Sequence, residues 1–178
     1  MKKLTLVIHP FFFAKLSHNR HSLDKNSLEE TLDTYKRGIQ FAKDGIVIVY
    51  RASPYNHYLQ VEEELFAYAQ QQIEKEGLYF YLPLDEQGDN DNDEGEFRVH
   101  EYIDNKLGEN LSETQLYGFG EDLAACVPWN LARVCRNHHF EMKPIVLARF
   151  CRIAPSFTFK ERFKELERYA RELDLVIE

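Results

Sequence analysis

The chain has 178 residues, 44% of them hydrophobic and 13% aromatic, which indicates one folded domain, residues 1–178, with a substantial core. Its net charge of −8 excludes a broad basic surface for nucleic acid, and its three cysteines do not suggest a disulfide framework. No apolar run approaches the ~18 residues of a membrane span. We therefore expect a cytoplasmic protein with no nucleic-acid or membrane partner.

Strand-like and helix-like segments alternate along the chain. Continuous apolar or β-branched runs predict strands at 4–8, 46–50, 78–84, 116–117, 144–150 and 175–177. Amphipathic stripes predict helices at 28–42, 61–73, 128–137 and 159–173, and capping boxes precede the first and the last. The alternation predicts an α/β fold: a three-layer α/β/α sandwich with a mostly parallel, six-stranded, Rossmann-like sheet and helices on both faces.

Two segments in the middle of the chain depart from this alternation. FRVHEY at 97–102 alternates apolar and polar residues and is interpreted as a strand. The polar segment at about 85–96 is interpreted as an acidic loop insertion, either solvated or a lid. Its aspartates are spaced like the first ligands of a calcium loop, but His100 occupies the closing carboxylate position. This mismatch favours a solvated loop over a calcium site.

The most informative stretch spans residues 115–136. It predicts a short strand, a Gly-x-Gly turn and a helix that begins at Pro128, since proline suits the first helical position. Cys126 would then lie just before the helix, where backbone N–H groups and the helix dipole stabilise a thiolate or an oxyanion. The alternative is a small buried cysteine that packs a turn.

LTLVIH at 4–9 and GFGEDLAACV at 118–127 resemble two motifs of the isochorismatase-like cysteine hydrolase family, which includes nicotinamidases. The later segments, PIVLARF at 144–150 and LDLVIE at the end, follow the same order of elements. The resemblance implies that a Cys126 thiolate attacks a carbonyl carbon, with an acid/base group and a lysine beside it. It also suggests a homo-oligomer.

The catalytic positions of the family are only partly matched. The family has an aspartate where this chain has His9, and its lysine has no clear match, only His100 or Arg98 on the predicted strand at 97–102 or Lys106 beyond it. YRASPYNH at 50–57 lacks the family's metal-binding pattern, so we expect no metal and no cofactor.

Two hypotheses follow. In the first, the protein is a cysteine hydrolase of a small amide or ester, with Cys126 as nucleophile, His9 as base and His100 as a further catalytic candidate. The alternatives are a strand-end histidine bonded to a loop carbonyl for His9 and a solvent-facing side chain for His100. In the second hypothesis, catalysis is lost and the fold serves as a binding or assembly module.

Aromatic side chains near the predicted site support the second hypothesis, because exposed aromatics often mark interfaces. Phe12 and Tyr55 lie on loops that would rim the pocket, and Trp129 would pack over the Cys126 turn. All three are candidate substrate-binding or partner-binding residues, and a small molecule is the ligand that we expect.

Overall fold

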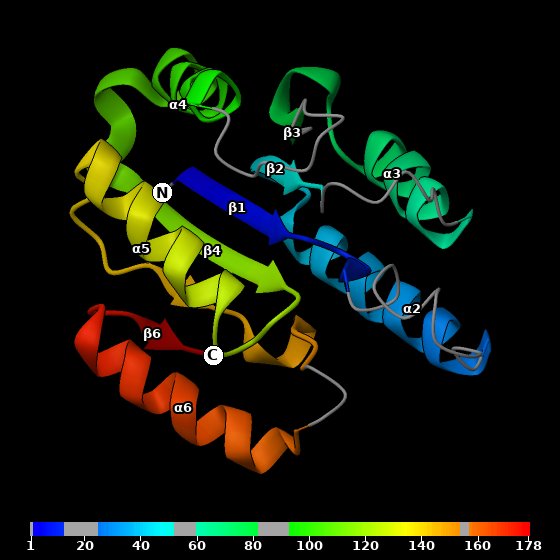
Figure 1. Cartoon of the computed structure of the whole chain (residues 1–178). Helices are drawn as coiled ribbons and strands as arrows, with labels where there is room; N and C mark the ends of the chain where they lie inside the picture. The colour runs from blue at the N-terminus through cyan, green and yellow to red at the C-terminus, as the bar shows by residue number, and fades with distance from the viewer. Residues whose placement is uncertain (1, 13–24, 52–59, 82–92, 154–156) are drawn as a thin grey trace.

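The computed structural model describes residues 2–12, 25–51, 60–81, 93–153 and 157–178, over which six strands alternate with five α-helices (Figure 1). The strands are β1 (Lys2–Ile8), β2 (Ile46–Tyr50), β3 (Leu78–Tyr81), β4 (Thr114–Gly120), β5 (Ile145–Val146) and β6 (Val176–Ile177). The helices are α2 (Lys25–Ala42), α3 (Gln60–Gln72), α4 (Asp93–Leu107), α5 (Cys126–His138) and α6 (Phe159–Glu172). Short 3-10 turns are η1 (Lys75–Gly77), η2 (Gly108–Glu113) and η3 (Ala148–Phe150).

The six strands form one parallel sheet in the order β3-β2-β1-β4-β5-β6. The predicted three-layer α/β/α fold is therefore confirmed. From β1 the chain adds strands in one direction to β3, then crosses back and adds β4, β5 and β6 on the other side of β1. The direction reverses between β1 and β4, and in such sheets ligands bind beyond the carboxyl ends of the strands at the point of reversal.

Consecutive residues of β4 show how the two faces of the sheet are covered. Phe119 lies so close to Gly38 of α2 that a Cβ there would meet its ring at 2.5 Å. Gly118 faces the opposite way, and a Cβ on it would lie 2.8 Å from Leu131 of α5. Since neighbouring strand residues point to opposite faces, α2 and α5 cover different faces of the sheet. Figure 1 shows α3 beside α2 and α6 beside α5.

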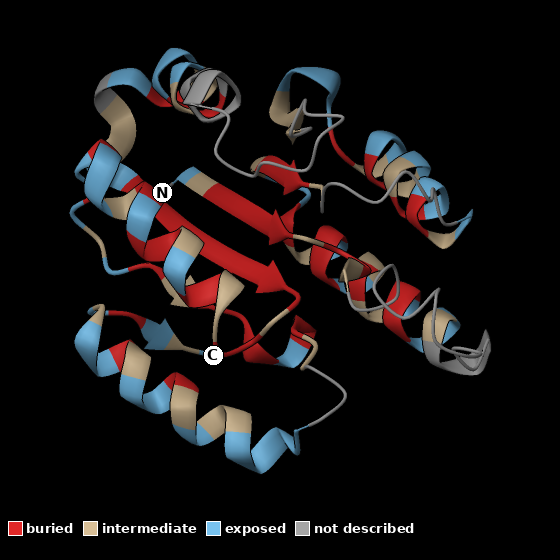
Figure 2. Ribbon diagram, in the orientation of Figure 1, coloured by how far each residue is buried: buried red, intermediate tan, exposed pale blue. Residues whose placement is uncertain are grey.

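The centre of the sheet carries the core. Every residue of β4 is buried, as is β1 from Leu4 to Ile8, and Figure 2 shows both strands as continuous buried segments. The outward face of α6 is exposed, in keeping with its alternation of charged residues. Within the described ranges, no helix is both long enough and apolar enough to cross a bilayer.

Several predicted bounds are corrected by the structure. Gly118 and Gly120 belong to β4 and do not form a turn. Both positions need glycine because α5 approaches Gly118 and β1 approaches Gly120 too closely for a Cβ. The strand predicted at 144–150 is limited to β5 and gives way to η3. The capping box that starts α6 is confirmed, since Thr158 accepts a hydrogen bond from the Glu161 N–H and the Glu161 carboxylate accepts one from the Thr158 N–H.

The segment at 97–102 is a helix, so the predicted strand is wrong. Val99, Ile103 and Leu107 of α4 are spaced four residues apart, and each is about 1% exposed. This helical stripe extends beyond the six residues whose alternation suggested a strand. The alternation was a short section of a 3.6-residue period.

Gly120 gives the sharpest test of the sheet. Its φ is +138°, and a Cβ at this position would lie 2.0 Å from the Ile8 carbonyl oxygen, which belongs to the backbone and has no rotamer to change. We expect Gly120→Ala to lower the free energy of unfolding by about 3 kcal/mol or more.

Gly108→Ala is the matched control. Gly108 also has a positive φ, +49°, but a Cβ there would have no heavy atom within 4 Å, so the cost should be about 1–2 kcal/mol. Urea unfolding of both variants measures the difference. Equal losses would contradict the close approach of β4 to β1.

Candidate active site at the carboxyl edge of the sheet

The carboxyl edge of the sheet carries titratable residues directly after neighbouring strands. His9 follows β1 and Glu121 follows β4, at the point where the strand order reverses. The Glu121 N–H donates to the Ile8 carbonyl at 2.9 Å, and the His9 N–H donates to the Tyr50 carbonyl at 2.8 Å. These ladder bonds extend the register of the sheet past the strand ends and fix both residues in place.

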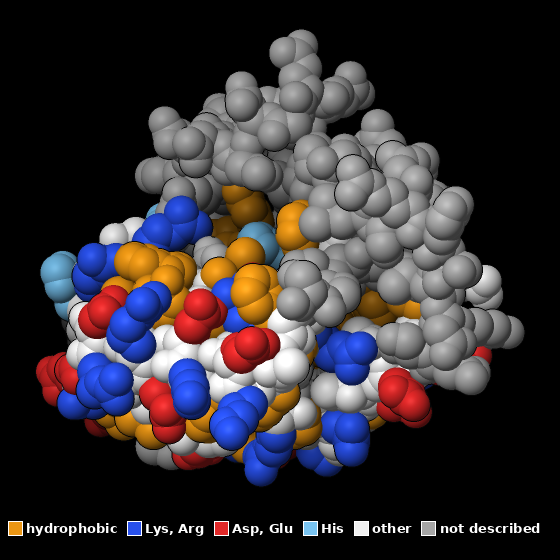
Figure 3. Space-filling model, turned by 60° about the horizontal axis from the view of Figure 1, so that its bottom comes forward, with side chains coloured by type: hydrophobic (Ala, Val, Ile, Leu, Met, Phe, Trp, Pro, Cys, Tyr) orange, Lys and Arg blue, Asp and Glu red, His pale blue; other side chains and the backbone are white. Residues whose placement is uncertain are grey.

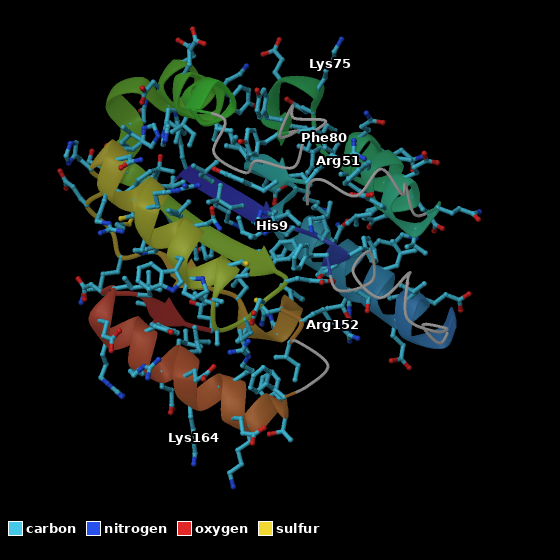
Figure 4. All side chains as sticks on the ribbon, in the orientation of Figure 1. His9, Arg51, Lys75, Phe80, Arg152 and Lys164 are labelled. Atoms are coloured by element: carbon cyan, nitrogen blue, oxygen red, sulfur yellow. The ribbon has the colours of Figure 1, made fainter. Side chains whose placement is uncertain are left out.

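His9 lies at the end of β1 (Figure 4) and has a left-handed backbone, with φ +47°. Its ring centroid lies 6.2 Å from that of Phe12, so this predicted rim residue lies beside a predicted catalytic residue. Burial lowers the pKa of His9 from 6.5 to about 4, and the positive charge of Arg133 on α5 acts in the same direction. The imidazole is therefore neutral at pH 7.

Cys126 is the first residue of α5, which differs from the predicted helix start at Pro128. Pro128 is the third helical residue, a position whose N–H would also lack an intrahelical acceptor. The Val127 N–H donates to the Asp122 carbonyl at 3.3 Å, and the Trp129 N–H donates to Ala125 at 3.2 Å. Within the described residues, no backbone acceptor is found for the Cys126 N–H, which instead acts on the Cys126 sulfur itself.

The thiol of Cys126 is half-buried, and its surroundings oppose ionisation. Burial raises its pKa most, followed by the negative charges of Asp122 and Glu121, whereas its own backbone N–H and Arg162 act in the opposite direction. Burial and the two carboxylates therefore act against the thiolate that the helix start is expected to stabilise.

Asp122 and Glu121 differ in their partners. Asp122 forms an ion pair with Arg162 of α6, with 3.1 Å between Oδ2 and Nη2, and both side chains are largely buried. Glu121 is 3% exposed and accepts a hydrogen bond of 3.1 Å from the hydroxyl of Tyr35 on α2. Sequence reasoning did not single out these two acids, although both lie in the segment between β4 and Cys126. Nothing in the sequence pointed to Arg162.

The candidate residues do not all meet. No hydrogen bond joins His9 to Cys126, both of which the structure describes, and His9 is not among the charges that act on the thiol. His100 lies on α4, where its Nδ1 is 2.5 Å from Nε2 of His138, the last residue of α5. Cys126 is the first residue of that helix, roughly 18 Å away at about 1.5 Å per residue. His100 therefore belongs to the opposite edge of the sheet.

His138 connects His100 to a carboxylate. Its Nδ1 is 2.9 Å from Oδ1 of Asp104, so His100, His138 and Asp104 form a hydrogen-bonded chain between α4 and α5. Burial lowers the pKa of His138, although Asp104 acts in the opposite direction. This chain joins two helices far from Cys126, which explains His100 without catalysis.

Of the other predicted residues, the structure describes Trp129 but not Tyr55. Trp129 is 47% exposed and packs edge-on against Tyr169 of α6, with ring centroids 5.8 Å apart, so it joins α5 to α6. Tyr55 and residues 85–92 of the insertion predicted at about 85–96 lie outside the described residues, as do the first two aspartates of the calcium-like pattern. Residues 93–96 belong to α4, so this part of the predicted loop is helical. Among the residues that are described, no group of three acidic, histidine or cysteine side chains is arranged to hold a metal ion.

The fold is similar to that of the YcaC gene product of Escherichia coli, described as an octameric hydrolase of unknown specificity. The TM-score is 0.51 at 13% sequence identity, and the match covers 99% of this chain and 73% of that one. At this identity the likeness concerns the fold alone. No protein-family model matches the sequence, and no curated protein matches it significantly.

The lowered pKa of His9 predicts a pH dependence of stability. The unfolded chain binds a proton at this imidazole near pH 6.5 and the folded chain only near pH 4, so stability present above pH 6.5 is lost as the pH falls toward 4. His9→Asn removes the titration and keeps a side chain that tolerates positive φ.

Urea unfolding at pH 7.5 and pH 4.5 measures this effect. The wild type should lose roughly 2 kcal/mol more than His9→Asn between the two values. An equal loss in the two proteins would mean that the imidazole binds a proton as readily in the folded chain as in the unfolded one.

Proposed function

We propose that this protein is a divergent isochorismatase-like hydrolase that cleaves a small amide or ester with Cys126 as its nucleophile. The observation that carries the proposal is the position of Cys126. It starts a helix at the carboxyl edge of a parallel sheet, next to the point where the strand order reverses, and its thiol is half-buried among charged groups. The similarity of the fold to an octameric hydrolase supports the reaction class.

The chemistry requires few groups. The thiol gives its proton to a base, and its sulfur attacks the carbonyl carbon of the substrate. The N–H of Cys126, at the start of α5, donates a hydrogen bond to the resulting oxyanion. The carbon–nitrogen or carbon–oxygen bond then breaks, the amine or alcohol leaves with a proton, and water hydrolyses the thioester to the acid and the free thiol.

Two departures from the family pattern concern the position of His9 and the missing lysine. His9, a neutral imidazole beside Phe12, can donate or accept a hydrogen bond to a bound substrate. Lys106 is an unsuitable substitute for the family lysine, since its Nζ lies 3.9 Å from the Glu76 carboxylate beside α4. A homo-oligomer and a small-molecule ligand remain predictions.

The raised pKa of the Cys126 thiol favours a second candidate function, a catalytically inactive binding module. Exposed aromatics such as Trp129, Phe157 and Phe159 would suit it, and Figure 3 shows hydrophobic side chains among mixed acidic and basic ones. A binding module should keep its ligand in Cys126→Ala and lose it when Phe12 is truncated.

Hydrolysis of p-nitrophenyl acetate and of a panel of small primary amides tests the proposed function. Cys126→Ala should lower kcat/KM at least about 100-fold, because no other group can form the thioester. Cys135→Ala is the matched control, since Cys135 lies nine residues further along the same helix, near its far end, and should keep wild-type turnover.

Mass spectrometry of the acetylated protein provides a second measurement. A transient acetyl group should appear on the peptide that contains Cys126 and on neither of the other cysteine peptides. Equal turnover in Cys126→Ala and wild type, or no turnover of any substrate in the panel, would contradict the hydrolase and leave the binding module.

A further inference from the structure

Asp122 and Cys126 flank a tight turn between β4 and α5. The N–H groups of Ala125 and Val127 both donate to the Asp122 carbonyl, at 3.2 Å and 3.3 Å, so the chain folds back on itself over these residues. The turn places the Asp122 side chain and the first residue of α5 at the same edge of the sheet. Among the charged groups that shift the pKa of the Cys126 thiol, Asp122 has the largest effect and raises that pKa.

The Asp122 carboxylate is held on one side and open on the other. Its Oδ2 accepts a hydrogen bond of 3.1 Å from Nη2 of Arg162, whereas among the described residues its Oδ1 has only a long contact of 3.4 Å, with the Ala124 N–H. Arg162 is fixed in turn by Glu165, at 2.5 Å, and by the ring of Phe157, 4.0 Å from the guanidinium carbon. One carboxylate oxygen is therefore oriented while the other can accept a further proton donor.

The other groups near the thiol are less suited to take its proton. Glu121 is buried beneath the edge and accepts the hydroxyl of Tyr35. Cys151, which also faces Asp122, is buried, and its pKa is raised to about 12. His9, which the structure also describes, forms no hydrogen bond with the thiol and is not among the charges that shift its pKa. From α6, Arg162 has no lone pair that could accept the proton, and Glu165 is paired with Arg162.

We propose that Asp122 is the general base that takes the proton of the Cys126 thiol, and that Arg162 is the positioning residue that orients it; this rests on the proposed hydrolase function. The proton moves from sulfur to Oδ1 as sulfur attacks the carbonyl carbon. The same carboxylic acid then gives the proton to the leaving amine or alcohol. Asp122 lies in the turn between β4 and α5, and Arg162 lies on α6. The family resemblance instead implies an acid/base group at the end of β1 and a lysine after β3.

The Asp122 carboxyl has suitable basicity for this role. Burial raises its pKa above the usual 3.8, although Arg162 and the Ala124 N–H act against that rise. A more basic carboxylate accepts a proton more readily from a neutral thiol. The raised pKa of Cys126 makes such a base necessary, since little thiolate exists at neutral pH.

Asp122→Asn tests the base directly with p-nitrophenyl acetate as the probe. We expect kcat to fall about 10²–10⁴-fold at pH 7 and the acidic limb of the pH–rate profile to disappear. The limb should persist in His9→Asn, because His9 carries no proton in the reaction. Glu172→Gln is the matched control, since it neutralises a carboxylate of the same helix that pairs with Arg168, and it should leave the rate within about threefold of wild type.

Arg162→Lys tests the positioning role and keeps the experiment decisive if Asp122→Asn does not fold. Lysine retains the charge but loses the planar fork, so kcat should fall about 10-fold while KM changes little. The inference is overturned if Asp122→Asn retains wild-type kcat with an acidic limb, or if Arg162→Lys is indistinguishable from wild type. In either case turnover that still depends on Cys126 leaves the proposed function intact, whereas a wild type without such turnover overturns both.

Discussion

The close approach of β4 to β1 at Gly120 and Ile8 is the constraint on which the candidate site depends. Only a glycine can bring the two backbones together there, since a Cβ would meet the Ile8 carbonyl at 2.0 Å. The contact lets the Glu121 N–H continue the ladder with Ile8 and directs the chain into the turn that precedes α5. As a result, the chain positions the thiol and its neighbouring carboxylates from the two central strands, and not from flexible loops.

Burial at this edge keeps His9 and the Cys126 thiol neutral. It lowers the pKa of His9 to about 4 and raises that of the Cys126 thiol, so a resting thiolate–imidazolium pair is disfavoured at neutral pH. A thiol in such surroundings reacts only when a nearby group removes its proton during the attack. The ion pair of Asp122 with Arg162 supplies a carboxylate and a cation beside the nucleophile, although neither residue occupies a position that the family resemblance implies.

Much of the fold could be predicted from the sequence, whereas much of the site could not. Buried β-branched runs such as 46–50 identify strands, and the capping box at Thr158 identifies the start of α6, because both signals are local. The helix at 93–107 was missed because its apolar stripe, Val99 to Leu107, is longer than the window that suggested a strand. Arg162 reaches Asp122 from 40 residues away, and such a contact depends on how α6 packs against the sheet.

The pH dependence of the alkylation of Cys126 by iodoacetamide tests the central claim most directly, namely that its thiol is neutral and depends on a carboxylate. Mass spectrometry on the native protein can follow all three cysteines at once, with buried Cys151 as an internal check of folding. We expect an apparent pKa of Cys126 above the ~8.5 of a free thiol in the wild type, and a lower one in Asp122→Asn. An apparent pKa near or below 7 that rises in His9→Asn would contradict this claim, because it would show a thiolate held by an imidazolium.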